Sequence, residues 1–77
     1  MEKPIAEFDR LGLAQHRAQS ALSDSHILDL RDLRVELVED ALILSGSVSS
    51  YYHKQLAQET VRQVAIELSV VNSIHVR

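Results

Sequence analysis

The stretch "LRVELVEDALILSGSV", residues 33–48, decides the fold, because apolar and polar residues alternate along it on both sides of a short acidic turn. Such alternation is typical of strands with one buried face and one face in water. Glu39 and Asp40 are expected to form the turn, so the two halves predict a β-hairpin. Its apolar face is predicted to carry Leu33, Val35, Leu37, Leu42, Leu44, Gly46 and Val48.

Helical periodicity lies on both sides of this hairpin. Apolar residues from Leu11 onward recur at helical spacing and predict a first helix that ends near residues 23–26. After the hairpin, Ser49 or Ser50 is expected to cap a second helix. The apolar stripe of that helix comprises Leu56, Ala57, Thr60, Val61, Val64 and Leu68. The β-branched run "SVVNSIHVR", residues 69–77, predicts a third strand.

This αββαβ order predicts an α+β fold, a two-layer sandwich with two helices packed on one face of a three-stranded mixed sheet. A right-handed crossover through the second helix should place the third strand parallel to the second, in sheet order 1-2-3. The connection before the first strand contains Ile27, Leu28 and Leu30. We expect these residues to tuck under the domain, because a wholly exposed run of this kind would be an unusual apolar patch.

Gly46 interrupts the second predicted strand on its apolar face. A glycine inside a strand often marks a close approach of another backbone, so we expect the helix layer to press on the sheet there. The alternative is a β-bulge or a local twist. Both interpretations give Gly46 a structural role and no ligand.

Length and charge limit what the chain can do. Its 77 residues predict one small domain over residues 11–77, preceded by a flexible N-terminal arm over residues 1–10. A net charge of -3 without a basic cluster argues against a nucleic-acid partner. The absence of cysteine leaves the redox compartment open. With no transmembrane segment and no signal peptide, we expect a cytoplasmic chain as it stands, or a periplasmic or envelope-associated one if it is an excised domain.

Two sequence blocks, "LILSGSV" at residues 42–48 and "VVNSIHV" at residues 70–76, resemble the BON domain, a small bacterial module named for osmotically induced periplasmic and nodulation proteins. With the first helix, the resemblance extends over about residues 11–77. Ala41 stands where the family usually has the glycine of Asp-Gly or Asn-Gly. We therefore expect a different hairpin turn, or Asp40 in the left-handed conformation. The family's Gly-Val before the last strand is also replaced, which predicts a second helix that runs slightly longer.

The resemblance implies a binding module without a catalytic motif. BON domains interact with phospholipids or proteins, commonly in envelope, stress-response or secretion proteins. We therefore expect a non-enzymatic module that contacts phospholipid headgroups or an envelope protein. The alternative is an oligomerising or ring-building module, a weak homo-oligomer that stacks through the open face of its sheet.

The residues themselves predict no catalysis, no metal and no cofactor. The histidines lie in four predicted elements without ligand spacing and are expected to be surface residues: His16, His26, His53 and His75. The serines around the second strand lack a nucleophile elbow and are expected to be structural: Ser45, Ser47, Ser49 and Ser50. An acidic cluster lacks a calcium-loop pattern and is expected to be a solvated edge: Asp29, Asp32, Glu36, Glu39 and Asp40.

The candidate contact residues are Tyr51, Tyr52 and Lys54, which follow the predicted helix cap. Tyrosine tips and a nearby lysine suit a lipid headgroup or a protein interface. The alternative is that one tyrosine packs over the end of the hairpin while the other points to water. Ile66 lies opposite the buried stripe of the second helix, where it is either a contact point or the place where the helix has ended.

Overall fold

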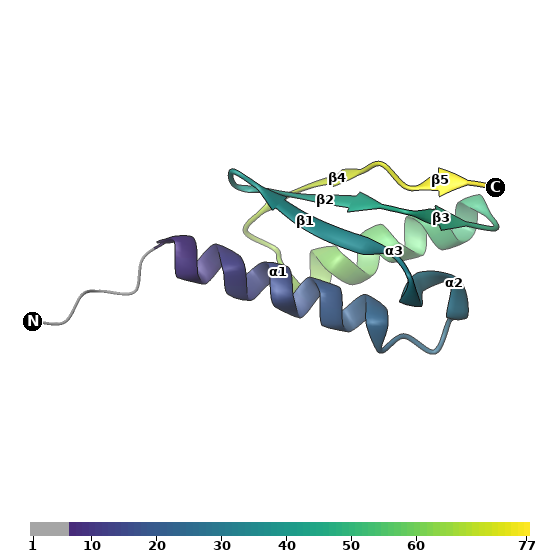
Figure 1. Cartoon of the computed structure of the whole chain (residues 1–77), viewed down its shortest axis with the longest axis horizontal. Helices are drawn as coiled ribbons and strands as arrows, with labels where there is room; N and C mark the ends of the chain where they lie inside the picture. The colour runs from purple at the N-terminus through teal and green to yellow at the C-terminus, as the bar shows by residue number, and fades with distance from the viewer. Residues whose placement is uncertain (1–6) are drawn as a thin grey trace, which may run out of the picture.

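The computed structural model describes residues 7–77, which form three helices and five strands (Figure 1). The helices are α1 (Glu7–Ser23), α2 (Leu28–Arg31) and α3 (Tyr51–Val64). The strands are β1 (Arg34–Val38), β2 (Ala41–Ser45), β3 (Ser47–Val48), β4 (Ser69–Asn72) and β5 (His75–Val76).

The main sheet has the predicted mixed topology. β1 and β2 form the antiparallel hairpin, with Val38 opposite Ala41. β2 pairs in parallel with β4, with Ile43 opposite Val71, and the strand order is β1-β2-β4. The predicted third strand is divided into two pieces, because β5 continues β4 and pairs in parallel with β3.

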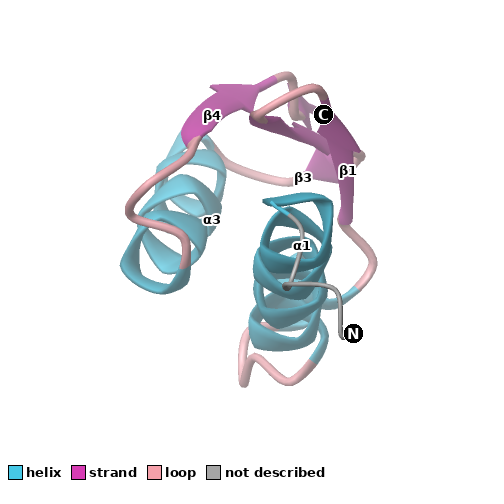
Figure 2. Cartoon of the chain, turned by 90° about the vertical axis from the view of Figure 1, so that its left-hand side faces the viewer, coloured by secondary structure: helices cyan, strands magenta, loops and turns pink. Residues whose placement is uncertain are grey.

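The helices α1 and α3 cover the same face of this sheet, which confirms the two-layer α+β sandwich (Figure 2). Ser50 caps α3 as predicted, since its side chain accepts a hydrogen bond from the backbone N–H of His53. The apolar residues that alternate along the hairpin pack against the apolar faces of α1 and α3, and together they form one core. A fully buried leucine contributes about 1.5–3 kcal/mol to such a core. Its buried members are Ala18, Leu22, Leu30, Leu33, Val35, Leu42, Leu44, Val48, Ala57, Val61, Ala65 and Ile74.

The segment before β1 differs from its prediction in three ways. α1 begins at Glu7, four residues earlier than the predicted start at Leu11, so the helix includes part of the expected arm; residues 1–6 lie outside the described part of the chain. The connection contains a single helical turn, α2. Leu30 is buried and Ile27 packs against the core, as predicted. Leu28 is 71% exposed, so the prediction that it tucks under the domain is wrong.

The outer edge of β1 is covered by two glutamines from α1. Gln19 accepts a hydrogen bond from the Val35 N–H at 2.9 Å and donates to the Leu33 carbonyl at 2.8 Å. Gln15 donates to the Val35 carbonyl at 3.0 Å. These side chains take the place of a further strand at Val35 and at the Leu33 carbonyl, whereas the outward backbone groups of Leu37 have no such partner within residues 7–77.

Gly46 separates β2 from β3 and is exposed, so the prediction that it lies under the helix layer is wrong. Its φ of 125° belongs to a region that residues with a side chain rarely adopt. A Cβ atom built on Gly46 would lie 2.8 Å from Cδ2 of Leu33. The close neighbour is therefore the residue that leads into β1, and the local irregularity of the strand is the correct alternative.

Of the two expectations for the hairpin turn, a different turn is confirmed, and Asp40 in the left-handed conformation is wrong. Glu39 has a φ of 58° and is the only non-glycine residue with positive φ in residues 7–77, so the left-handed residue is Glu39 and not Asp40. A two-residue loop with positive φ at its first position alone has the sign pattern of a type II′ turn, which favours glycine at that position.

Glu39→Gly is therefore expected to raise the free energy of unfolding by about 0.5–1 kcal/mol, because relief of left-handed strain exceeds the entropy cost of glycine. Asp40→Gly is the matched control. It should lower stability, since Asp40 does not have a positive φ. Urea denaturation of both variants measures the difference, and equal effects would contradict this description of the turn.

The end of the second long helix, α3, also differs from its prediction. α3 ends at Val64 with Ala65 at its C-cap, so the prediction of a slightly longer helix with Leu68 on its apolar stripe is wrong. Ile66 follows in the turn and is 80% exposed. Of the two interpretations of Ile66, its position just beyond the end of the helix is the one that the structure confirms.

Candidate functional site

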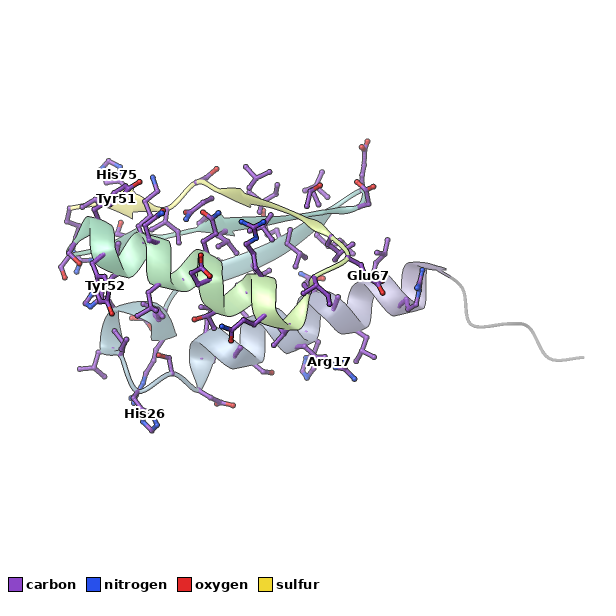
Figure 3. All side chains as sticks on the ribbon, turned by 180° about the vertical axis from the view of Figure 1, so that it is seen from behind. Arg17, His26, Tyr51, Tyr52, Glu67 and His75 are labelled. Atoms are coloured by element: carbon purple, nitrogen blue, oxygen red, sulfur yellow. The ribbon has the colours of Figure 1, made fainter. Side chains whose placement is uncertain are left out.

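The three predicted contact residues lie together on the first turn of α3. The side chains of Tyr51 and Tyr52 are 64% and 68% exposed, and Lys54 is half-buried. Neither ring packs over the end of the hairpin, so both tyrosines project at one end of the domain (Figure 3). The Tyr52 ring contacts the His53 ring at a centroid distance of 5.7 Å.

Ser50 sets the start of this helix. It has an extended backbone, with φ -150° and ψ 157°, and its hydroxyl accepts a hydrogen bond from the His53 N–H at 3.1 Å. The cap places Tyr51 and Tyr52 at the first two positions of the helix, where their backbone N–H groups have no partner within it. Exposed aromatic rings and free N–H donors are thus presented at the same place.

Asp29, from α2, holds the start of α3 against the rest of the domain. Its carboxylate accepts hydrogen bonds from the Ser49 N–H at 2.8 Å and from the Ser49 hydroxyl at 2.6 Å. The same oxygen accepts from Nδ1 of His53 at 2.7 Å, and the other accepts from the Arg77 guanidinium at 3.3 Å. We call Asp29, Ser49, His53 and Arg77 the Asp29 cluster. It links α2, the β3–α3 junction, α3 and the residue after β5.

The hydrogen bonds hold the pKa of the Asp29 carboxyl well below its usual range, with the Ser49 hydroxyl and backbone N–H making the largest contributions and His53 adding to them. The Asp29 side chain is 16% exposed. A carboxylate accepts hydrogen bonds only, so Nδ1 of His53 must carry the proton in this contact. The tautomer and the orientation of the ring are therefore fixed.

The Asp29 cluster contains Ser, His and Asp, yet it does not have the geometry of a catalytic triad. In a triad the imidazole lies between the serine and the carboxylate and removes the serine proton. Here Asp29 lies between Ser49 and His53 and binds both. A carboxylate with a strongly lowered pKa is also a weak base. The chemistry of the cluster is therefore that of a structural clamp.

The prediction for the acidic residues is wrong at one position, Asp29. The expectation of a solvated acidic edge is right for Asp32, Glu36, Glu39 and Asp40, which are exposed, but it is wrong for Asp29. No group of three or more His, Cys, Asp or Glu side chains in residues 7–77 is arranged to hold a metal ion. Nothing in the spacing indicated the cluster, because its members are 20 to 48 residues from Asp29 in sequence.

A second exposed apolar surface lies at the opposite end of the domain. Leu13 on α1 and Ile66 after α3 are 48% and 80% exposed and line a shallow groove of about 350 Å³. Arg10 and Arg17 line the same groove, and Arg10 pairs with Glu67 at 3.6 Å. Figure 3 shows Arg17 and Glu67 far from the two tyrosines. Of the residues on this surface, only Ile66 could be named from the sequence as a candidate contact point.

No described helix is long and apolar enough to cross a bilayer. The model of one protein family, described as the BON domain, matches residues 13–77, which is most of the chain. Among curated proteins, none matches the chain significantly.

Proposed function

Because the chain belongs to the BON domain family, we propose that it is a non-enzymatic binding module that contacts an anionic phospholipid surface through Tyr51, Tyr52 and Lys54. The family is one of phospholipid-interacting binding modules and is not a known enzyme family. The observation that carries the proposal is the pair of exposed tyrosine rings at the capped start of α3.

The rings have the chemistry of a membrane interface. A tyrosine ring prefers the headgroup level of a bilayer, where its apolar part leaves water and its hydroxyl remains solvated. The free N–H groups of the first turn and the positive end of the helix dipole favour phosphate oxygens. Ring burial and phosphate binding thus reinforce each other at one helix start.

The net charge of -3 does not oppose this contact, because the charges are unevenly distributed. Lys54 lies at the end that carries the tyrosines, and the charges of Arg77 and Asp29 there offset each other in their ion pair. Glu39 and Asp40 lie at the tip of the hairpin, at the opposite end of the domain in Figure 1. The 14 residues of α3 span about 21 Å, which exceeds the Debye length of about 10 Å at 0.1 M salt. Salt therefore screens a membrane that contacts the tyrosines from the negative charges at the tip of the hairpin.

We expect the chain to co-sediment weakly with vesicles of phosphatidylglycerol and phosphatidylcholine in low salt. Replacement of Tyr51, Tyr52 and Lys54 by serine should reduce partitioning at least about tenfold, since a basic residue near an anionic surface contributes about 1 kcal/mol and the rings add their own burial. Vesicle sedimentation with quantified bound protein is the measurement.

The matched control replaces Leu13, Ile66 and Arg17 by serine, which removes two exposed apolar side chains and one charge from the groove at the other end. This control should bind as the wild type does. If it loses binding while the tyrosine variant retains it, the groove is the contact surface and the assignment of the tyrosines is wrong. If the wild type does not sediment with vesicles at all, direct lipid binding is wrong, and a partner protein becomes the better proposal.

A further inference from the structure

The outer edge of β4 and β5 carries backbone groups without partners within residues 7–77, apart from the Ile74 N–H, which donates to Oδ1 of Asn72 at 3.1 Å. The N–H groups of Ser73, His75 and Arg77 donate to carbonyls of the neighbouring β2–β3 segment at 2.8–2.9 Å. Because successive residues of a strand point their backbone groups to opposite sides, those of Val70 and Val76 point away from the sheet. Within residues 7–77, no residue bonds to these outward groups, and Figure 2 shows β4 at the margin of the sheet.

This edge lacks the protection that the other edge has. Residues 68–76 contain no Asp, Glu, Lys, Arg or Pro, although charged residues make up 25% of the chain. Proteins usually block such a strand edge with a charge, a proline or a covering segment. β1 is blocked in part in this way, by Gln15 and Gln19, and it also carries Arg34 and Glu36. Within residues 7–77, the β4–β5 edge is therefore the longer uncovered edge of the sheet, since on β1 only the outward backbone groups of Leu37 remain without a partner.

We propose that two copies of the chain pair through their β4–β5 edges in an antiparallel arrangement, which joins two sheets into one continuous sheet. The charges at the two ends of the edge favour this occupant. Glu67 precedes the uncharged run and Arg77 follows it, with 76% and 56% of their side chains exposed. Within the chain these side chains pair with Arg10 at 3.6 Å and with Asp29 at 3.3 Å, so a second copy adds a further partner to each of them. Antiparallel pairing places Glu67 of each copy near Arg77 of the other, whereas parallel pairing would place like charges together.

The pairing is weak and concentration-dependent, because the two strands contribute only four and two residues and the contact is smaller than a standard stable interface. The edge is distinct from the open face of the sheet and from the tyrosines at the start of α3. Self-association through it therefore goes beyond the proposed membrane contact. Each proposal can fail while the other stands.

Sedimentation equilibrium of the chain from about 10 µM to 1 mM tests the proposal. We expect a monomer–dimer equilibrium, and Val71→Lys should raise its dissociation constant at least tenfold by placing lysines of both copies beside the shared edge. Val71 is 45% exposed on β4. The matched control is Val38→Lys, because Val38 is 52% exposed on β1, the partly covered edge, and this variant should dimerise as the wild type does.

Exchange of the end charges gives a second test. Glu67→Arg alone should weaken the dimer, and Glu67→Arg combined with Arg77→Glu should restore it, because the complementary pairs are then re-formed in reverse. A wild type that remains monomeric to 1 mM would overturn the proposal, as would equal effects of Val71→Lys and Val38→Lys. Circular dichroism melting of each variant shows that a lost dimer reflects the edge and not unfolding.

Discussion

Gly46→Val is expected to lower the free energy of unfolding by about 2–4 kcal/mol, a large part of the roughly 4–12 kcal/mol available to a domain of this size. Two separate effects contribute to this loss of unfolding free energy. Valine would have to adopt a φ near the 125° of Gly46, in a region that is nearly restricted to glycine. Its Cβ atom would also lie 2.8 Å from Cδ2 of Leu33, which is only 1% exposed and has little room to move. The better strand propensity of valine recovers less than about 1 kcal/mol.

Gly12 provides the matched control for Gly46. It lies within α1, and a Cβ atom added there would meet nothing within 4 Å. Gly12→Ala should therefore raise stability by about 0.5–1 kcal/mol, while Gly46→Ala should lower it. Urea denaturation of the two alanine variants gives the comparison directly. A Gly46→Ala variant as stable as the wild type would show that the backbone at this break adopts an ordinary strand conformation.

Asp29→Ala is expected to lower the thermal midpoint by several degrees, because it removes the acceptor of the Asp29 cluster and leaves the Ser49 and His53 donors without their partner. The loss should be greatest at the start of α3, where amide hydrogen exchange of residues 51–54 should become faster. Asp32→Ala is the control, since the Asp32 side chain is exposed and makes no hydrogen bond within residues 7–77. It should change the midpoint by no more than about 3 °C.

The effect of Asp29 on stability depends on pH in a defined direction. Its carboxyl has a lower pKa in the folded chain than the value of about 3.9 for an unfolded aspartate, so the folded state binds fewer protons. The stabilisation is complete above pH 5 and is lost as the pH falls below about 4. The difference in unfolding free energy between wild type and Asp29→Ala should therefore shrink from pH 5 to pH 2. A difference that stays constant over this range would contradict the role of the ionised carboxylate.

The layers and topology of the fold could be predicted from the sequence because they follow from periodicity. The alternation from Leu33 to Leu44 and the stripe of Ala57 and Val61 each specify a buried face, and these faces meet in the core. The exceptions depend on backbone conformation. Glu39 adopts the left-handed conformation although Asp40 has the better intrinsic preference, because the strand register on both sides fixes which position must turn.

The candidate site could be predicted only in part, for a different physical reason. Tyr51 and Tyr52 could be placed at the helix start because a serine cap is a local signal. The Asp29 cluster has no local signal, since it joins residues from distant parts of the chain through tertiary contacts. The same holds for Gln15 and Gln19, which occur as ordinary polar residues of an amphipathic helix and gain their role only when α1 lies beside β1.

Those two glutamines determine how far self-association can proceed. A sheet with two open edges can add molecules at both ends without limit, and growth of this kind leads to fibrils. In this domain Gln15 and Gln19 occupy the hydrogen-bonding positions of Val35 and of the Leu33 carbonyl on one edge, so a pair joined through the other edge presents a partly covered strand at each outer margin. On the proposal that two copies pair through the β4–β5 edge, we expect assembly through the sheet to stop at two copies. In the proposed dimer the partner closes the uncharged β4–β5 edge, and the covered part of β1 hinders the addition of a third chain.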